Sequence, residues 1–191
     1  MSSASASSSE QPTAFTTPID DAELVARLRA NRPGALESLY ERHATSLLRL
    51  AARLCGSADD AEDVVQDVFV GLTLAIRHYQ EQGTFASWLR TVTARTALMH
   101  RRRVDRAERM ENAHDASAHA AQRAESVLER IALESAIKNL PQPLRDVFVL
   151  YHIERFTHAE IADLLDIKRG TAEVRLFRAV RRLRALLEGD R

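Results

Sequence analysis

The end of the chain carries the side chains with the clearest chemical capability. From Lys168 onward the sequence is basic, and its arginines fall largely outside an apolar stripe that recurs at helical spacing. The arginines are Arg175, Arg178, Arg181, Arg182 and Arg184, and the stripe comprises Ala172, Leu176, Ala179, Val180, Leu183 and Leu187. Such a helix can contact DNA phosphates and base edges, although arginine on a helix is also typical of an ordinary solvated surface.

A shorter helix is expected immediately before the basic one. Thr157 and Glu160 have the spacing of a capping box, which opens a helix that runs through Ile161 and Leu165. Two short helices joined by a tight turn, the second of them basic, form the pattern of a helix-turn-helix. The sequence therefore favours a DNA reader over a plain surface helix.

A helix expected in the first half of the chain is acidic, opposite in charge to the basic helix near the end. Ser57 is its expected cap, and Asp63, Gln66, Asp67 and Val70 follow at i, i+3, i+4 and i+7 along one side. Its apolar stripe comprises Ala61, Val64, Val65, Val68, Phe69 and Leu72. The mixed acidic and apolar strip suits docking against a basic partner helix; the alternative is a solvated acidic face.

Aromatic residues and arginines follow one another in the next expected helix, which Thr84 caps. Phe85 and Trp88 come first, then Arg90, Arg95 and the cluster 101–103. Aromatic rings and guanidinium groups together can hold unstacked bases and their phosphates. The alternative is that the rings belong to the core of a helical bundle, which we expect at least for the body of Trp88.

These segments must be positioned by helices, because glycine and proline are few and no long segment alternates like a β-strand. We predict an all-α protein of two small helical domains joined by a flexible linker. The expected boundaries are a disordered tail over 1–18, a first domain over 19–104, a linker over 105–128 and a second domain over 129–191, in which Pro143 suits the first turn of a helix.

Composition excludes several classes of protein. The 191 residues have a formal net charge of zero, so charge is distributed locally rather than as one basic field. A single cysteine, Cys55, excludes an internal disulfide, and His43 has no partner at metal-binding spacing, so no metal site and no cofactor are expected. The chain has no apolar run long enough to span a membrane and no signal peptide, which predicts a cytoplasmic protein without membrane insertion.

Taken in order, these pieces resemble the sigma-70 family of bacterial transcription initiation factors, and more narrowly its extracytoplasmic-function (ECF) group. The resemblance covers nearly everything from Leu24 to Leu187 except the linker. The stretches that carry it are Asp60-Ala61-Glu62-Asp63-Val64-Val65-Gln66-Asp67-Val68-Phe69, Phe85-x-x-Trp88-Leu89, the arginine cluster, Leu140-Pro141, Glu160-Ile161-Ala162 and Gly170-Thr171-x-x-x-Arg175-Leu176-x-Arg178-Ala179.

The resemblance implies that the first domain is sigma region 2 and the second is sigma region 4, and it implies three sets of functional residues. Docking on the β′ clamp helices of core RNA polymerase falls to Asp60, Asp63, Gln66, Asp67 and Val70. Capture of the melted −10 element falls to Tyr79, Trp88, Arg90, Arg95, Arg101 and Arg102. Reading of the −35 element in the major groove falls to Lys168, Arg169, Thr171, Glu173, Val174, Arg175 and Arg178.

The chain departs from the family at positions that read DNA. Lys168 and Arg169 stand where a small polar residue often precedes Gly-Thr, and they could reach phosphates. Glu173 would be repelled by phosphates but could accept a hydrogen bond from a cytosine amino group. Arg95 and Met99 replace an asparagine and an aspartate that are typical of many relatives. The departures predict distinctive promoter sequences.

The resemblance implies an ECF-type sigma factor with no catalytic residues, whose partners are core RNA polymerase (β′ clamp and β flap), promoter DNA and an anti-sigma factor. A polymerase-independent helix-turn-helix repressor is the second hypothesis, although it needs neither the acidic helix nor the aromatic and arginine segment. An enzyme has little support, because the sequence has no glycine-rich phosphate loop and no nucleophile–base pair. A helical adaptor is a further alternative.

Overall fold

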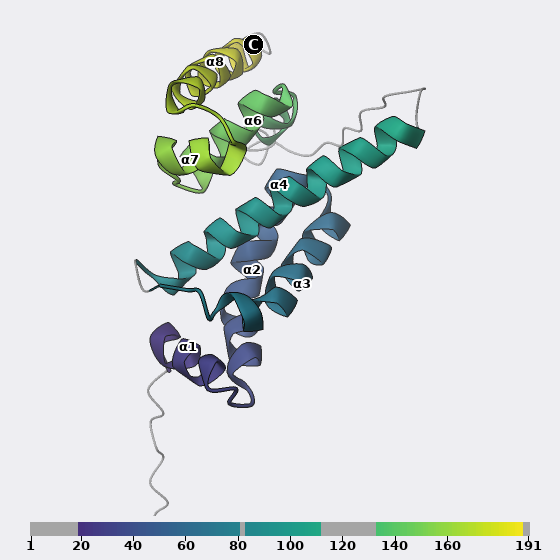
Figure 1. Cartoon of the computed structure of the whole chain (residues 1–191). Helices are drawn as coiled ribbons and strands as arrows, with labels where there is room; N and C mark the ends of the chain where they lie inside the picture. Colours follow the sequence, from purple (N-terminus) through teal and green to yellow (C-terminus); the bar gives the residue numbers. More distant parts are fainter. Residues whose placement is uncertain (1–18, 81–82, 112–132, 189–191) are drawn as a thin grey trace, which may run out of the picture.

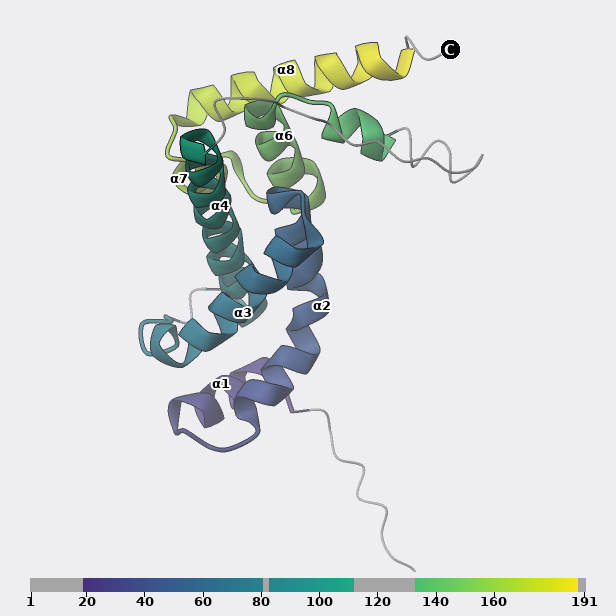
Figure 2. The same cartoon turned by 90° about the vertical axis from the view of Figure 1, so that its right-hand side faces the viewer.

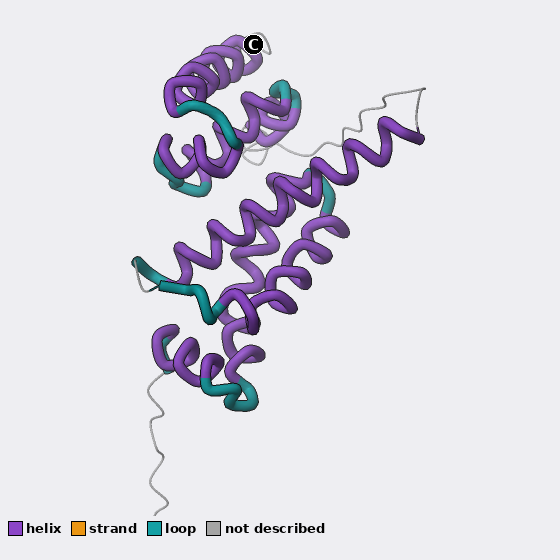
Figure 3. The backbone as a smooth tube through the Cα atoms, viewed as in Figure 1, coloured by secondary structure: helices purple, strands orange, loops and turns teal. Residues whose placement is uncertain are grey.

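The computed structural model describes residues 19–80, 83–111 and 133–188, and these residues fold as helices joined by short turns without a strand (Figure 3). The helices are α1 (Asp21–Arg29), α2 (Ala35–Cys55), α3 (Ala58–Ala75), α4 (Phe85–Glu111), a short helix over 133–138, α6 (Gln142–Phe148), the π-helical turn η1 (Val149–Ile153), α7 (His158–Leu165) and α8 (Arg169–Glu188). The all-α prediction is confirmed. In this described part, no helix is both long and apolar enough to cross a membrane.

Helices α2, α3 and α4 form the bundle of the first half, and α1 packs beside them (Figure 1). Every member of the predicted stripe of α3 is buried, and the Ser57 hydroxyl accepts the predicted capping hydrogen bond from the Asp60 amide. Thr84 likewise accepts a hydrogen bond from the Ser87 amide at the start of α4. Gly56 ends α2 in the left-handed conformation, at φ +86°, where residues with a Cβ are strained.

Helices α6, α7 and α8 form the second half, and they confirm the predicted helix-turn-helix. Both hydrogen bonds of the Thr157–Glu160 capping box are present at the start of α7, and Asp166 turns the chain toward α8 at φ +55°. Pro143 lies in the first turn of α6, as predicted. Ala136, Leu140, Ala179 and Leu183 form a small core between α8 and the helices before it.

The predicted stripe of α8 is only partly correct. Ala172, Ala179 and Leu183 are buried, whereas Leu176 and Val180 are half-buried. Leu187 is exposed, contrary to the prediction, because it follows Leu183, the last residue of α8 in that core. The N-terminal part of α8 is therefore anchored more firmly than its carboxyl end.

The two halves pack against each other along α4, which lies between the α2–α3 pair and α6 to α8 in Figure 1. The turned view shows α7 at one end of α4 and α6 above the end of α2 (Figure 2). Leu150, Phe156, Ile161 and Leu164 of the second half belong to the same buried cluster as the core of the first half. Helix α4 continues to Glu111, so the expected linker begins as helix; its remaining residues and the tail over 1–18 lie outside the described residues.

Two leucines on α3 test the packing of the bundle. Leu72 is buried and Leu74 is exposed on the same helix. We expect Leu72→Ala to lower the free energy of unfolding by about 2–5 kcal/mol, because it opens a cavity in the core. Leu74→Ala is the matched control and should change it by no more than about 0.5 kcal/mol. Urea titration followed by circular dichroism measures both, and equal effects would contradict the described packing.

Candidate nucleic-acid and protein interfaces

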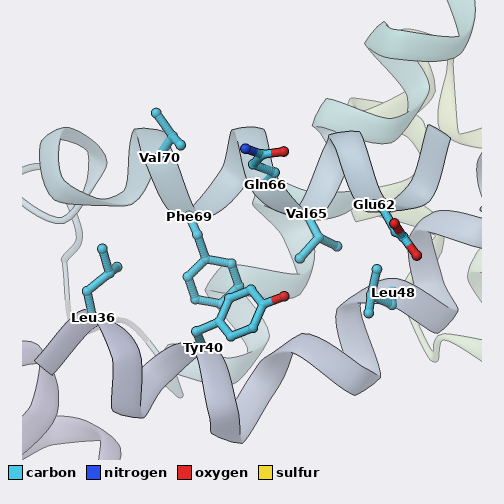
Figure 4. Close-up of a pocket in the computed structure, with 8 residues that line it drawn as sticks. All are labelled: Leu36, Tyr40, Leu48, Glu62, Val65, Gln66, Phe69 and Val70. Atoms are coloured by element: carbon cyan, nitrogen blue, oxygen red, sulfur yellow. The ribbon is translucent and has the colours of Figure 1, made fainter. Parts of the chain in front are cut away.

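A groove between α2 and α3 opens on the surface of the first half (Figure 4). Its lining comprises Leu36, Tyr40 and Leu48 from α2, and Glu62, Val65, Gln66, Phe69 and Val70 from α3. The rings of Tyr40 and Phe69 meet edge to face, with centroids 4.9 Å apart, at the floor of the groove. Val70 leaves 70% of its surface exposed at the rim. A protein helix can bury this apolar lining.

The predicted polymerase-binding residues do not form one surface. Gln66 and Val70 line the groove, and Asp63 and Asp67 are exposed on the same helix. Asp60 differs, because its Oδ1 lies 2.9 Å from Nε2 of His100 on α4 and its side chain is half-buried. Sequence reasoning did not single out Tyr40, which is 47% exposed in the gap between the two helices.

Cys55 lies close to the Asp60–His100 pair, at the end of α2. Its Sγ is 3.8 Å from the carbonyl oxygen of Ala97, and the side chain is half-buried. Burial, together with the negative charge of Asp60 and against the opposite effect of Arg101, raises the pKa of the Cys55 thiol to about 11. The thiol is therefore protonated and unreactive at neutral pH. Within the described part of the chain, no group of three or more His, Cys, Asp or Glu side chains could hold a metal ion.

An aromatic cluster precedes and begins α4. Tyr79 and Phe85 are buried with ring centroids 5.6 Å apart, and Trp88 lies 5.0 Å from Tyr79. Trp88 is half-buried against the core, as expected for its body. Tyr79, predicted to contact −10 DNA, is buried and lines a pocket together with Gly83 and Thr84.

That pocket also receives charged side chains from α1 and α2. Asp20, Asp21 and Arg42 line it, and Asp21 accepts a hydrogen bond of 2.7 Å from Arg42. The second carboxylate oxygen of Asp21 lies 3.1 Å from Nε2 of His43, which packs edge to face on Phe85. The pocket therefore combines aromatic walls with carboxylates that accept hydrogen bonds.

Arg101 lies at the boundary between the two halves rather than on an open surface. Its Nη1 and Nη2 donate to the two carboxylate oxygens of Asp146 on α6, at 2.9 and 2.7 Å. Nη1 also donates to the carbonyl oxygen of Leu54 at 2.6 Å. The side chains of Arg101 and Asp146 are only 11% and 8% exposed. The Nη1 and Nη2 groups of Arg101, which was predicted to contact −10 DNA, are thus already bonded to Asp146 and Leu54.

A second ionic contact joins the halves around Glu154, which follows η1. Nη1 of Arg53 on α2 lies 2.6 Å from its Oε1, and Nη2 of Arg90 lies 3.5 Å from its Oε2. Arg90 also donates to the Glu154 carbonyl oxygen and lies over the Phe156 ring, 5.2 Å from its centroid. Arg102 donates to the carbonyl of Leu165 at 3.3 Å, whereas Arg95 is exposed.

The predicted −35 residues gather at the start of α8. Lys168, Arg169, Thr171, Glu173, Val174 and Arg178 are exposed, and Arg175 is half-buried. Nε of Arg169 donates to Glu173 Oε1 at 3.0 Å, so the two departures from the family pattern neutralise each other in the free protein.

Sequence reasoning missed Phe177, which leaves 68% of its surface exposed one turn after Val174. Its spacing gave the signal: two positions before Ala179 on an α-helix is nearly opposite the buried side. Phe177 and Val174 form an apolar pair among the arginines of α8.

Comparison with known proteins assigns the family. The Sigma-70 region 2 model matches residues 39–107, and the Sigma-70, region 4 model matches residues 130–183. The chain belongs to the sigma-70 family of RNA polymerase sigma factors, in its ECF group.

Named relatives and solved structures agree with this family. The chain is 34% identical over 165 residues to the RNA polymerase sigma factor CarQ of Myxococcus xanthus, covering 84% of this chain and 94% of CarQ. It is 32% identical over 157 residues to the ECF sigma factor SigE of Mycolicibacterium smegmatis, covering 79% of this chain but only 61% of SigE.

Among solved structures, CnrH in complex with the cytosolic domain of CnrY matches with a TM-score of 0.57 and 29% identity, over 88% of this chain and 97% of CnrH. The sigma factor RpoE of Bartonella quintana, solved with the anti-sigma factor NepR, matches with a TM-score of 0.61 and 22% identity, over 83% and 99%. The match to RpoE shows that the two proteins share a fold.

The pH dependence of Cys55 reactivity tests the contact between α2 and α4. A rise in pKa from 9.0 to about 11 lowers the thiolate fraction about 100-fold at pH 8, so iodoacetamide should react with Cys55 correspondingly slowly. Asp60→Asn should accelerate the reaction, because the Asp60 carboxylate raises the pKa. Mass spectrometry at several pH values measures the rates, and a native rate equal to that in urea would contradict the described environment.

Proposed function

We propose that this protein is a promoter-specificity subunit of RNA polymerase: it binds the core enzyme, captures the −10 element and reads the −35 element. The observation that carries the proposal is the presence, in one chain, of an acidic helix beside an apolar groove, an aromatic and arginine segment, and a basic helix-turn-helix. The protein contributes no catalytic residue and no cofactor. It acts in the cytoplasm, where the polymerase and the promoters are.

Core polymerase docks on α3 and the groove beside it. The exposed carboxylates of Asp63 and Asp67 attract a basic helix of the β′ clamp, and the groove lined by Tyr40 and Val70 buries its apolar side chains. Such an interface has an apolar centre and a charged rim, which is the usual arrangement in protein–protein contacts. Asp60 contributes indirectly, by holding His100 and thereby α4 against the start of α3.

The −10 element binds along α4 and the turn before it. The pocket at Tyr79 and Phe85 suits one base flipped from the stack, since its rings offer apolar walls and the carboxylates of Asp20 and Asp21 accept hydrogen bonds from amino groups. Arg90, Arg95, Arg101 and Arg102 lie farther along the same helix, where they meet the phosphates of the displaced strand.

The −35 element binds the N-terminal half of α8 in the major groove. Arg169 and Lys168 contact phosphates, while Val174 and Phe177 contact thymine methyl groups. The carboxylate of Glu173 accepts a hydrogen bond from a cytosine amino group only when Arg169 leaves this carboxylate and binds a phosphate instead.

The second half also contacts the β flap. A regulatory protein of the anti-sigma kind is a further proposed partner. The solved complex of CnrH with the cytosolic domain of CnrY supports this proposal.

Charge reversal on α3 tests the polymerase contact. We expect Asp63→Arg/Asp67→Arg to abolish binding to core RNA polymerase in a pull-down, because two attractive contacts become repulsive ones and both side chains are exposed. Asp163→Arg, at an exposed acid of α7, controls for charge. Circular dichroism verifies the fold, and undiminished binding by the double variant would contradict the assignment.

Truncation of Phe177 tests the −35 contact. We expect Phe177→Ala to lower the affinity of holoenzyme for promoter DNA about tenfold, since a ring that becomes buried against bases loses its contact. Replacing −35 thymines by deoxyuridine should affect the wild type more than the variant. Leu187→Ala removes an exposed apolar side chain at the far end of the same helix and should have no effect. Equal affinities for wild type and Phe177→Ala would refute the contact.

A further inference from the structure

We propose that Arg29, the last residue of α1, is a positioning residue for capture of a −10 base, because it holds Tyr79 in the wall of the pocket that receives the base. This role rests on the proposed function, since the pocket at Tyr79 and Phe85 is the one assigned to the base. Arg29 lies outside the residues that match the region 2 family model, which are 39–107. It adds a residue of α1 to a function otherwise assigned to α4 and the turn before it.

Arg29 contacts both the backbone and the ring of Tyr79. Its Nη2 donates to the carbonyl oxygen of Tyr79 at 2.6 Å, and its Nε donates to the carbonyl oxygen of Ile76 at 3.4 Å, a longer and weaker hydrogen bond. The guanidinium carbon also lies 5.6 Å from the centre of the Tyr79 ring, within reach of a cation–π interaction. One side chain therefore constrains the turn over 76–80 at two carbonyl groups and one ring.

The end of α3 favours such a cation. The carbonyl groups of a last helical turn form the negative end of the helix dipole, and the last turn of α3 contains no basic residue. Ile76 caps α3, and its carbonyl oxygen accepts from the Tyr79 amide at 3.3 Å as well as from Arg29. Arg29 thus brings a positive charge from another helix to the carbonyl groups where the chain leaves α3.

Tyr79 transmits this constraint to the pocket. Its ring is 6% exposed and lies 5.6 Å from the Phe85 ring and 5.0 Å from the Trp88 ring, measured between centroids. Its hydroxyl donates to the carbonyl oxygen of Gly83 at 3.5 Å. The described lining of the pocket includes Tyr79, Gly83 and Phe85 but not Arg29, so Arg29 acts on the base through Tyr79.

Helix α1 joins the two kinds of wall that the pocket has. Asp20 and Asp21, where α1 begins, supply its carboxylates, and Arg42 holds that end by donating to Asp21 at 2.7 Å and to the carbonyl oxygen of Ile19. Arg29 holds the aromatic wall from the other end of the same helix, which has only nine residues. A base must fit the carboxylates and the rings together, so loss of the Arg29 contacts should reduce the preorganisation of the pocket.

The test is a cycle that combines variants of the protein with variants of the DNA. Core RNA polymerase is reconstituted with the full chain, and anisotropy measures its affinity for a fluorescein-labelled promoter fragment with an unpaired −10 element. Single abasic sites, placed in turn through the element, identify with the wild type the base whose removal weakens binding most. The cycle then uses the intact fragment and the fragment that lacks this base.

We expect Arg29→Ala to lower the affinity for the intact fragment about tenfold and to cause no further loss on the abasic fragment. Arg27→Ala is the matched control, because Arg27 lies on the same helix in an exposed pair with Glu23. It should behave like the wild type on both fragments. Arg29→Lys retains the charge but not the planar fork of donors, so it should restore only part of the affinity.

Equal losses for Arg29→Ala on the intact and abasic fragments would overturn the proposal, because Arg29 would then support the fold and not the base. Undiminished affinity for the intact fragment would also overturn it. If Arg29→Ala loses its helical circular dichroism signal, Arg29→Lys passes through the same cycle, with a smaller loss confined to the intact fragment. Wild-type holoenzyme that is insensitive to every abasic site would refute the proposed capture of a base, and this role of Arg29 with it.

Discussion

The guanidinium group of Arg101 cannot be left uncompensated where the structure places it. It lies between the carbonyl of Leu54 and the carboxylate of Asp146, and a buried cation without an anion is strongly destabilising. The chain satisfies this requirement with its own carboxylate. The position of the second half and the accessibility of α4 are thereby linked.

The same constraint explains how a nucleic-acid-binding chain has a formal net charge of zero. Acidic and basic groups are distributed so that each surface has its own complement: the carboxylates of α3 remain exposed for a basic partner, whereas those of Asp146 and Glu154 cover arginines of α4 and α2. On α8 the Arg169–Glu173 pair is exposed and therefore weak.

The local parts of this arrangement could be predicted from the sequence, because helix periodicity and caps depend on neighbouring residues. The stripe of α3, the Ser57 and Thr157 caps and the helix-turn-helix all follow from spacings within one or two turns. The partner of Arg101 could not, because Asp146 lies 45 residues later and only the packing of the halves brings it there. Leu187 was misplaced for the same reason, since helical spacing does not show where the small core ends. The groove at Tyr40 likewise depends on how α2 and α3 pack.

Transcription initiated by core RNA polymerase on fragmented genomic DNA from the source organism decides most directly whether this chain is a sigma factor. Core enzyme supplemented with the purified protein should produce new, discrete start sites that share two upstream sequence elements. Absence of new start sites, together with tight binding of the protein alone to duplex DNA, would contradict this role and favour a helix-turn-helix repressor.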